Sequence, residues 1–150
     1  MIIYKKKLSI KQITKKEELK FKKIFNIYIK EILKVKYISE NKVDAHLIKI
    51  KNNIGKINWI IEKNKQIGFL VFYLNHEKLN CYIRDFFIKK KYRKKEVGTL
   101  IVKKLIASCN RRSFKFIKID IIKTNKSAIK FWKKLYFKKN GKSYYLKLDK

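Results

Sequence analysis

The stretch of residues 81–137 constrains the fold of this chain more than any other. An alternating segment at Asn80–Ile88 is typical of a half-buried strand, and a basic loop follows it. The loop opens an amphipathic helix whose apolar stripe consists of Val97, Leu100, Ile101, Leu105 and Ile106. Such a strand–loop–helix gathers free backbone N–H groups and a helix N-terminus at one point, and it therefore favours binding of an anion. The sequence thus predicts a phosphate-bearing ligand.

The length and composition predict one globular domain covering residues 1–150. The hydrophobic fraction of 46% argues for a packed core, and no apolar run is long enough to span a membrane. Residues 1–7 are followed by no apolar stretch, so we expect no secretory signal and take the cytoplasm as the location. Cys81 and Cys109 provide neither a disulfide framework nor the ligand spacing of a metal site.

The formal net charge of +31 is extreme for a chain of this size. One interpretation is an acidic partner, such as a nucleic acid, a ribosome or an acidic protein. The other is compositional drift, because the chain is rich in residues with AT-rich codons, contains no proline and has four glycines. The lysines are spread over the sequence, and both interpretations stay open. In either case the surface repels polycations, so aminoglycosides and polyamines are poor candidate substrates.

Hydrophobic periodicity and turn signals predict a mixed α/β or α+β domain. A capping box at Thr14 and Glu17 predicts the start of a first helix that runs to about Val35. Further helices are predicted at residues 41–51, 97–110 and 128–136, with turns at Asn64-Lys65 and Asn140-Gly141. The predicted strands are residues 7–13, 57–62, 66–74, 80–88, 114–122 and 144–148.

Residues 92–99 and 125–137 form two motifs that resemble those of the GNAT superfamily of N-acetyltransferases. The letters YRKKEVGT at residues 92–99 are similar to the family's acetyl-CoA signature, Arg/Gln-x-x-Gly-x-Gly/Ala. The letters NKSAIKFWKKLYF at residues 125–137 are similar to its later motif, Asn-x-x-Ala-x-x-Phe-Tyr-x-x-x-Gly-Phe. Asp85 and the three apolar residues after it lie where the family has an Asp on the central strand. The resemblance covers residues 9–148 and implies a GNAT-like, mostly antiparallel sheet flanked by helices.

The resemblance also implies acetyl-CoA as the acyl donor and assigns residues to its binding. The backbone of Phe86, Phe87 and Ile88 would hold the pantetheine arm, and the Ile88 amide would polarise the acetyl carbonyl. The diphosphate would lie against the amides and the helix dipole of the next loop. That loop consists of Arg93, Lys94, Lys95, Glu96, Val97, Gly98 and Thr99. Asn125 and Trp132 complete the implied coenzyme site; without a ligand, Asn125 is simply an N-cap.

The chain departs from the family pattern at two positions. Glu96 replaces the first glycine of the signature, and a negatively charged side chain opposes both an unusual φ and a close phosphate. Trp132 replaces the tyrosine that protonates the leaving thiolate in many members, and indole cannot act as that acid. Tyr136 lies one helical turn later on roughly the same face, so we predict it as the catalytic acid. A solvent proton is the alternative.

Asp120 is the predicted general base that takes the proton of the acceptor amine. It lies five residues before Asn125, and ribosomal-protein N-terminal acetyltransferases resemble this spacing with a Glu. The alternative, of equal weight, is that Asp120 pairs with a neighbouring lysine such as Lys118.

The other polar residues have simpler interpretations. We expect Asp85 to satisfy loop amides and Arg84 to be solvated on its strand. His46 has no partner at metal-ligand spacing, so we expect it at the surface or in packing contacts, and we predict no metal site. Tyr144 and Tyr145 alternate along the last strand, so one is expected to pack and the other to line a cleft.

Taken together, the residues and the resemblance predict an N-acetyltransferase that transfers the acetyl group directly to a primary amine. The acceptor is a protein or peptide amine or a small molecule, and an acidic or ribosome-associated acceptor fits the charge best. We expect a monomer or a homodimer. Two alternatives remain: a catalytically decayed GNAT-like binding module, and a basic RNA-binding protein without a cofactor.

Overall fold

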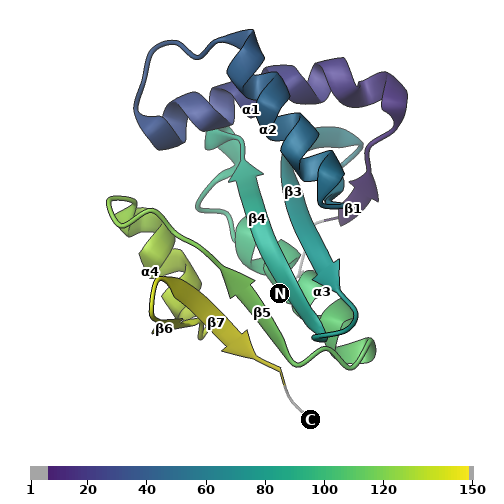
Figure 1. The fold of residues 1–150 in the computed structure, drawn as a ribbon, viewed down its shortest axis with the longest axis vertical. Helices are drawn as coiled ribbons and strands as arrows, with labels where there is room; N and C mark the ends of the chain where they lie inside the picture. Colours follow the sequence, from purple (N-terminus) through teal and green to yellow (C-terminus); the bar gives the residue numbers. More distant parts are fainter. Residues whose placement is uncertain (1–6, 149–150) are drawn as a thin grey trace, which may run out of the picture.

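The computed structural model describes residues 7–148, and its elements follow the order predicted from the sequence (Figure 1). The four helices of these residues are α1 (Glu18–Leu33), α2 (Glu40–Asn52), α3 (Val97–Arg111) and α4 (Lys126–Lys134). Two short 3₁₀ helices, η1 (Lys15–Glu17) and η2 (Lys90–Tyr92), precede α1 and α3. The strands are β1 (Leu8–Gln12), β2 (Lys56–Glu62), β3 (Lys65–Asn75), β4 (Asn80–Ile88), β5 (Phe116–Ile119), β6 (Lys138–Asn140) and β7 (Ser143–Lys147).

All seven strands form one sheet in the order β1-β2-β3-β4-β5-β7-β6. Neighbouring strands are antiparallel except β4 and β5, which are parallel. Strand β4 pairs with β3 from Asn80 to Ile88, but it pairs with β5 only from Asn80 to Ile83. The two central strands therefore diverge after Ile83. This confirms the expected mixed, mostly antiparallel sheet.

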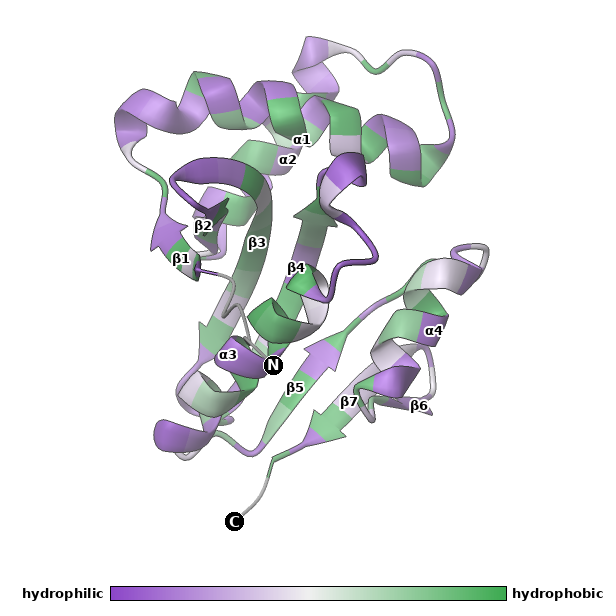
Figure 2. Cartoon of the chain, turned by 180° about the vertical axis from the view of Figure 1, so that it is seen from behind, coloured by the Kyte–Doolittle hydropathy of each residue, from purple (hydrophilic) through white to green (hydrophobic). Residues whose placement is uncertain are grey.

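Two hydrophobic cores cover the two faces of the sheet. On one face α1 and α2 pack through an aromatic cluster in which Phe21 and Phe25 contact Phe69 of β3. On the other face the apolar stripe of α3, together with Trp132 and Leu135 from the end of α4, packs on Ile83 and Ile117. Figure 2 shows α3 in front of the largely hydrophobic strands β3 and β4, and α4 next to β6 and β7. The candidate site lies between these two helical layers, at the point where β4 and β5 diverge.

The predicted capping box is present and holds the start of the first helical segment. The Thr14 backbone N–H donates to Glu17 Oε1 at 2.9 Å, and the Glu17 carboxylate also accepts a hydrogen bond from Trp59 Nε1. These hydrogen bonds cap the start of the helical segment and link it to β2, and they therefore fix the direction in which α1 begins. The helix ends at Leu33, before a left-handed Lys34, close to the predicted end at Val35.

The structure corrects two predicted boundaries. Strand β5 covers only Phe116–Ile119, instead of residues 114–122, and its far end coincides with the end of its pairing with both β4 and β7 at Ile119. The first hairpin turns at Lys63 and Asn64, both left-handed, instead of at Asn64-Lys65, since Lys65 already pairs with Glu62. Two residues at positive φ match the twist of the flanking strands.

None of the helices described here is long and apolar enough to cross a membrane. The expectation about a secretory signal concerns residues 1–7, of which 1–6 lie outside the described part.

Candidate active site

Strand β4 contains a β-bulge at the point where it diverges from β5. The register of β3 on β4 passes from Phe72↔Ile83 to Val71↔Asp85, so Arg84 is the extra residue of a β-bulge. The bulge changes which side chains point to which face: Ile83 lies in the α3–α4 core, whereas Phe87 lies in the α1–α2 core. As a result both Arg84 and Asp85 point toward α1 and α2, where they have partners.

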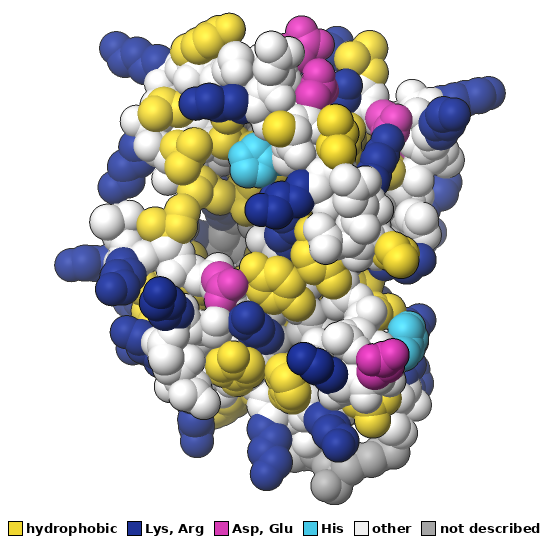
Figure 3. Space-filling model, in the orientation of Figure 1, with side chains coloured by type: hydrophobic (Ala, Val, Ile, Leu, Met, Phe, Trp, Pro, Cys, Tyr) yellow, Lys and Arg dark blue, Asp and Glu magenta, His cyan; other side chains and the backbone are white. Residues whose placement is uncertain are grey.

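The peptide groups of Phe86 and Ile88 face the gap that β5 leaves. Lys89 donates its backbone N–H to Ile67 O of β3 at 2.8 Å. Hydrogen-bonded and non-hydrogen-bonded pairs alternate along antiparallel strands, so Phe87 is in a bonded pair and its two neighbours are not. Their N–H and C=O groups therefore point away from β3, and the surface is hollowed in this region (Figure 3).

The Arg93 side chain already has partners. Its Nε donates to Ile88 O at 2.7 Å, and its two terminal nitrogens donate to both carboxylate oxygens of Glu31 on α1, at 2.6 and 3.0 Å. The guanidinium also lies 5.4 Å from the centre of the Phe87 ring, and the Arg93 backbone N–H donates to Lys90 O. Arg93 thus links α1 to β4, and a contact with a diphosphate requires it to exchange these partners.

The loop before α3 has the backbone shape of a glycine-containing turn without the glycine. Lys94 and Glu96 are both left-handed, with φ of 60° and 65°. Glu96 is the N-cap of α3 and makes no side-chain capping bond. A left-handed non-glycine residue costs about 1–2 kcal/mol, so this geometry is held by its surroundings. The N–H groups of Val97, Gly98 and Thr99 form the first helical turn and have no intrahelical acceptor.

Gly98 brings α3 close to an aromatic cluster between α4 and β4. A Cβ at Gly98 would lie 3.3 Å from the Phe131 ring and 3.6 Å from the Phe86 ring. Phe86 stacks on Phe131 at 6.0 Å between centroids and contacts Trp132 edge-on at 5.6 Å. The absence of a side chain at Gly98 therefore permits close packing of α3 on these two rings. Trp132 is 3% exposed, so it acts here as a core residue.

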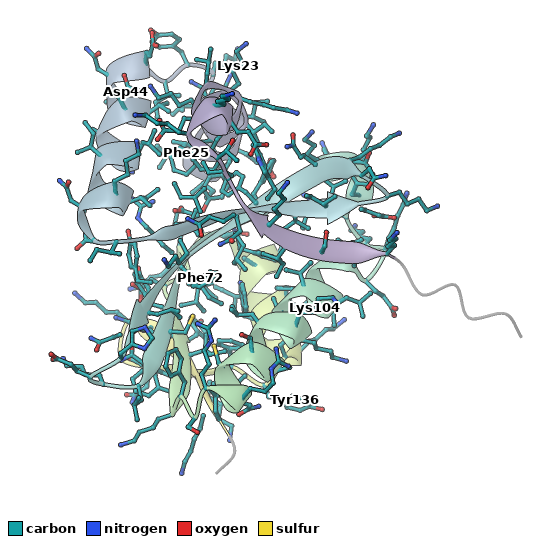
Figure 4. All side chains as sticks on the ribbon, turned by 90° about the vertical axis from the view of Figure 1, so that its right-hand side faces the viewer. Lys23, Phe25, Asp44, Phe72, Lys104 and Tyr136 are labelled. Carbon is teal, nitrogen blue, oxygen red and sulfur yellow. The ribbon has the colours of Figure 1, made fainter. Side chains whose placement is uncertain are left out.

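The structure corrects the geometry expected for Tyr136. Helix α4 ends at Lys134, and Tyr136 has a left-handed φ of 69°. Its side chain is 80% exposed and projects at the surface, far from the α1–α2 layer (Figure 4). The prediction that it shares a face with the buried Trp132 is wrong, because the helical spacing ends before it. Tyr136 occupies the position of the glycine in the family's later motif, and its backbone keeps the conformation that glycine favours.

Asn125 caps α4, as its simpler interpretation predicts. Its side-chain oxygen accepts the Ala128 N–H at 3.1 Å, and the residue is exposed beside the divergence of β4 and β5. The amide nitrogen of the same side chain is the group left for a ligand, so its coenzyme contact stays a prediction.

Asp120 follows β5 and accepts two hydrogen bonds. The Tyr82 hydroxyl donates to Oδ2 at 3.0 Å, and the Ser143 hydroxyl donates to Oδ1. The alternative of a Lys118 ion pair is wrong, since the Lys118 ammonium lies over the Tyr82 ring at 5.1 Å instead. Burial and the Asp120 hydrogen bond raise the pKa of Tyr82, which therefore stays a donor. Each Asp120 oxygen keeps a lone pair for a further donor.

A second polar group lies under α1 and α2. Asp85 is buried and accepts from the Tyr28 hydroxyl at 2.9 Å and from Arg84, whose other terminal nitrogen lies 3.2 Å from His46 Nδ1. Asp85 is structural as expected, but its partners are side chains, not loop amides. The expectation of a solvated Arg84 is wrong, since its side chain is only 15% exposed. Burial raises the pKa of Tyr28, and burial with the Arg84 charge lowers that of His46.

Sequence reasoning missed Glu31, Tyr28, Tyr82 and Ser143. Each of these residues is separated from its partner by 23 to 62 positions in the sequence, so no local spacing of residues predicts the contact. His46 packs edge-on against Phe25 at 6.0 Å, as expected of a packing residue. Within residues 7–148 no three metal-ligating side chains come together.

Comparisons with known proteins agree with this geometry. Similar folds include a GNAT-family acetyltransferase from Staphylococcus aureus Mu50, with a TM-score of 0.73, 17% identity, and coverage of 95% of this chain and 99% of that one. They also include PaiA N-acetyltransferase from Thermoplasma acidophilum in complex with coenzyme A (TM-score 0.70, 12% identity, coverage 95% and 99%). A third is spermidine N-acetyltransferase from Vibrio cholerae in complex with CoA and spermine (TM-score 0.73, 12% identity, coverage 93% and 95%).

No curated protein sequence matches the chain. At these identities the structural likeness shows the fold alone. Residues 21–137, most of the chain, match the Acetyltransferase (GNAT) family, and this match covers both motifs and the divergent strands. The chain therefore belongs to the GNAT family of acetyltransferases.

Proposed function

We propose that the chain is an N-acetyltransferase that uses acetyl-CoA and transfers the acetyl group directly to a primary amine. The observation that carries this proposal is the end of β4–β5 pairing at Ile83, which leaves the backbone N–H groups of Phe86 and Ile88 open to a ligand. Two of the similar folds are named as complexes with CoA. Acetyl-CoA supplies an activated thioester acetyl group; the remaining roles belong to the chain's own residues.

The free donors fit a coenzyme with a diphosphate and a carbonyl. The N–H groups of Val97, Gly98 and Thr99, at the positive end of the α3 dipole, suit the diphosphate. The outward N–H groups of Phe86 and Ile88 suit the pantetheine arm and the oxyanion that forms at the acetyl carbon. Lys94 and Lys95 offset the negative charge of Glu96 at the edge of this cradle.

Asp120 is the proposed base for the acceptor amine. Tyr82 and Ser143 fix the orientation of its carboxylate and leave lone pairs for an ammonium group. Because Trp132 has no suitable proton and Tyr136 projects from the surface, we propose that water protonates the leaving thiolate. A thiolate is a tolerable leaving group, so the reaction does not require a side-chain acid.

A second candidate is a GNAT domain that binds coenzyme without transferring its acetyl group. The Glu96 carboxylate at the mouth of the diphosphate cradle and the tryptophan in place of the motif tyrosine favour it.

The test combines titration calorimetry with acetyl-CoA and a free-thiol assay over a panel of amines and N-terminal peptides. We expect binding, thiol release that depends on the acceptor, and a loss of about 100-fold or more in kcat for Asp120→Asn. Coenzyme affinity should not change in this variant. Glu77→Gln, which removes a carboxylate on the β3–β4 turn, is the matched control and should behave as wild type. Binding without turnover selects the second candidate, and no binding at millimolar acetyl-CoA refutes both.

A further inference from the structure

One face of the sheet is only half covered. The core under α1 and α2 draws its strand residues from β2, β3 and β4, and none of its members within residues 7–148 comes from β5, β6 or β7. Figure 1 shows these lower strands without a helix in front of them, while α3 and α4 lie behind. The uncovered side begins at the divergence of β4 and β5, next to the proposed site of transfer.

The strand register lines up aromatic and basic side chains on this uncovered side. Tyr73, Tyr82, Lys118 and Tyr145 are direct neighbours across β3, β4, β5 and β7. In the next row of the same face Phe116 faces Lys147. The open sheet face is defined here by these six residues. Its rings are half-buried and contact one another, Tyr73 with Tyr82 at 5.7 Å and Phe116 with Tyr145 at 5.6 Å.

The charges around this face have a clear order. Asp120 lies at one end of this face, because residues 116, 118 and 120 point to the same side of the sheet. Its carboxylate oxygens keep lone pairs that can accept hydrogen bonds from a cation. Asp85, the other acidic group near the bulge, is already paired with Arg84. The other charged residues along this face are basic. They are Lys118, Lys147 and Lys138, the last of which is the β6 neighbour of Tyr145. Figure 3 looks onto this side and shows basic and apolar side chains with few acidic ones.

We propose that the open sheet face docks the acceptor, and that the acceptor is a peptide or protein N-terminus followed by acidic side chains. This inference rests on the proposed function and names its substrate class. The α-ammonium group would be held by Asp120, the first residues would lie on the tyrosine rings, and acidic side chains would meet the lysines. Two residues of strand separate Asp120 from Lys118, about 7 Å at 3.3 Å per residue, so the second and third residues of the acceptor carry the selectivity.

The same arrangement should disfavour a free polycation as the acceptor. A single carboxylate can hold one ammonium group, and further positive charges on the same ligand would lie against Lys118 and Lys147. Selectivity therefore comes from repulsion of the wrong ligand as well as attraction of the right one.

The test uses three peptides of equal length that begin Ser-Glu-Glu, Ser-Gln-Gln and Ser-Lys-Lys, with thiol release measured at low and high salt. We expect kcat/KM for the acidic peptide to exceed that for the neutral one by roughly 10-fold at low salt, and the difference to shrink at high salt. Lys147→Glu and Lys118→Glu should each abolish or reverse this order. Lys147→Glu is at the exposed end of its strand, so it keeps the test usable should Lys118→Glu fail to fold.

Lys104→Glu is the matched control, because it makes the same charge change on α3, on the opposite side of the sheet from α2 (Figure 4). It should leave the order of the peptides unchanged. Equal kcat/KM for all three peptides, or an equal response to Lys104→Glu and Lys147→Glu, overturns the inference. Preferential competition by single-stranded RNA with no peptide selectivity also overturns it, in favour of a nucleic-acid partner.

If no acceptor causes release of the coenzyme thiol, the proposed function fails. Fluorescence anisotropy of a labelled acidic peptide then tests the docking inference separately. Binding that Lys147→Glu removes and Lys104→Glu preserves supports it; no binding refutes it.

Discussion

Gly68→Ala tests whether the position of the Phe86–Ile88 segment depends on its contact with β3. A Cβ at Gly68 would lie 2.0 Å from Phe87 O and 3.0 Å from Ile88 Cα, both of them backbone atoms that no rotamer change can remove. To reach an ordinary contact, β3 and β4 would have to separate by roughly 1.5 Å at this point. Overpacking of this kind costs typically 1–3 kcal/mol. For a chain of this length that corresponds to a fall in Tm of roughly 3–10 °C.

The same shift moves the peptide groups proposed to hold the acetyl carbonyl. A misplacement of about 1 Å reduces turnover by about 100-fold, so kcat should fall far more than the modest loss of stability explains. Differential scanning fluorimetry and the free-thiol assay measure the two effects on one sample. Gly141→Ala is the control: its Cβ meets no atom within 4 Å, and its φ of 63° gives only local strain in the closing turn. A Gly68→Ala protein with wild-type Tm and turnover would refute the reasoning.

Three further predictions concern charge and hydrogen bonding. Glu96→Gly keeps a left-handed backbone and removes a carboxylate from the diphosphate cradle, so calorimetry should show acetyl-CoA binding several-fold more tightly; unchanged affinity contradicts this. Tyr28→Phe removes one of the two partners of buried Asp85 and should lower the urea-unfolding free energy by about 1–3 kcal/mol; no loss would show that the bond is dispensable. Burial and Arg84 lower the pKa of His46 below 6.5, so the unfolded state takes up its proton first as the pH falls. Stability should therefore decline below about pH 7, and His46→Gln should flatten the decline; parallel pH profiles would count against it.

The order of elements was predictable because their patterns are local. The alternation at Asn80–Ile88 and the apolar stripe after Val97 specify a strand and a helix whatever surrounds them. The motif residues could be placed along the chain for the same reason. Their partners could not, since Arg93 meets Glu31 across 62 residues and Tyr82 meets Asp120 across 38. Contacts of this kind are consequences of the sheet order, which periodicity does not reveal.

The error about Tyr136 has a specific cause. Helical spacing relates two positions only while the helix continues, and α4 ends at Lys134. The family's motif places a glycine at this position, and a glycine just past a helix end is a termination signal. Both non-glycine residues at motif glycine positions, Glu96 and Tyr136, keep a left-handed backbone. The fold thus retains the backbone geometry of the motif where the residue identity has been lost.

The bulge at Arg84 connects these observations into one structural argument. If β4 alternated regularly through Arg84 without a bulge, Asp85 would lie on the same face as Ile83 and lose its hydrogen bond with Tyr28. With the bulge, β4 is held to α1 on one face through the Asp85 and Arg93 contacts and to β3 along one edge, while its other edge is free beyond Ile83. A strand fixed on one edge and free on the other presents its peptide groups to a ligand at little entropic cost. The polar residues under α1 therefore stabilise an open backbone edge, and the proposed chemistry depends on that edge staying open.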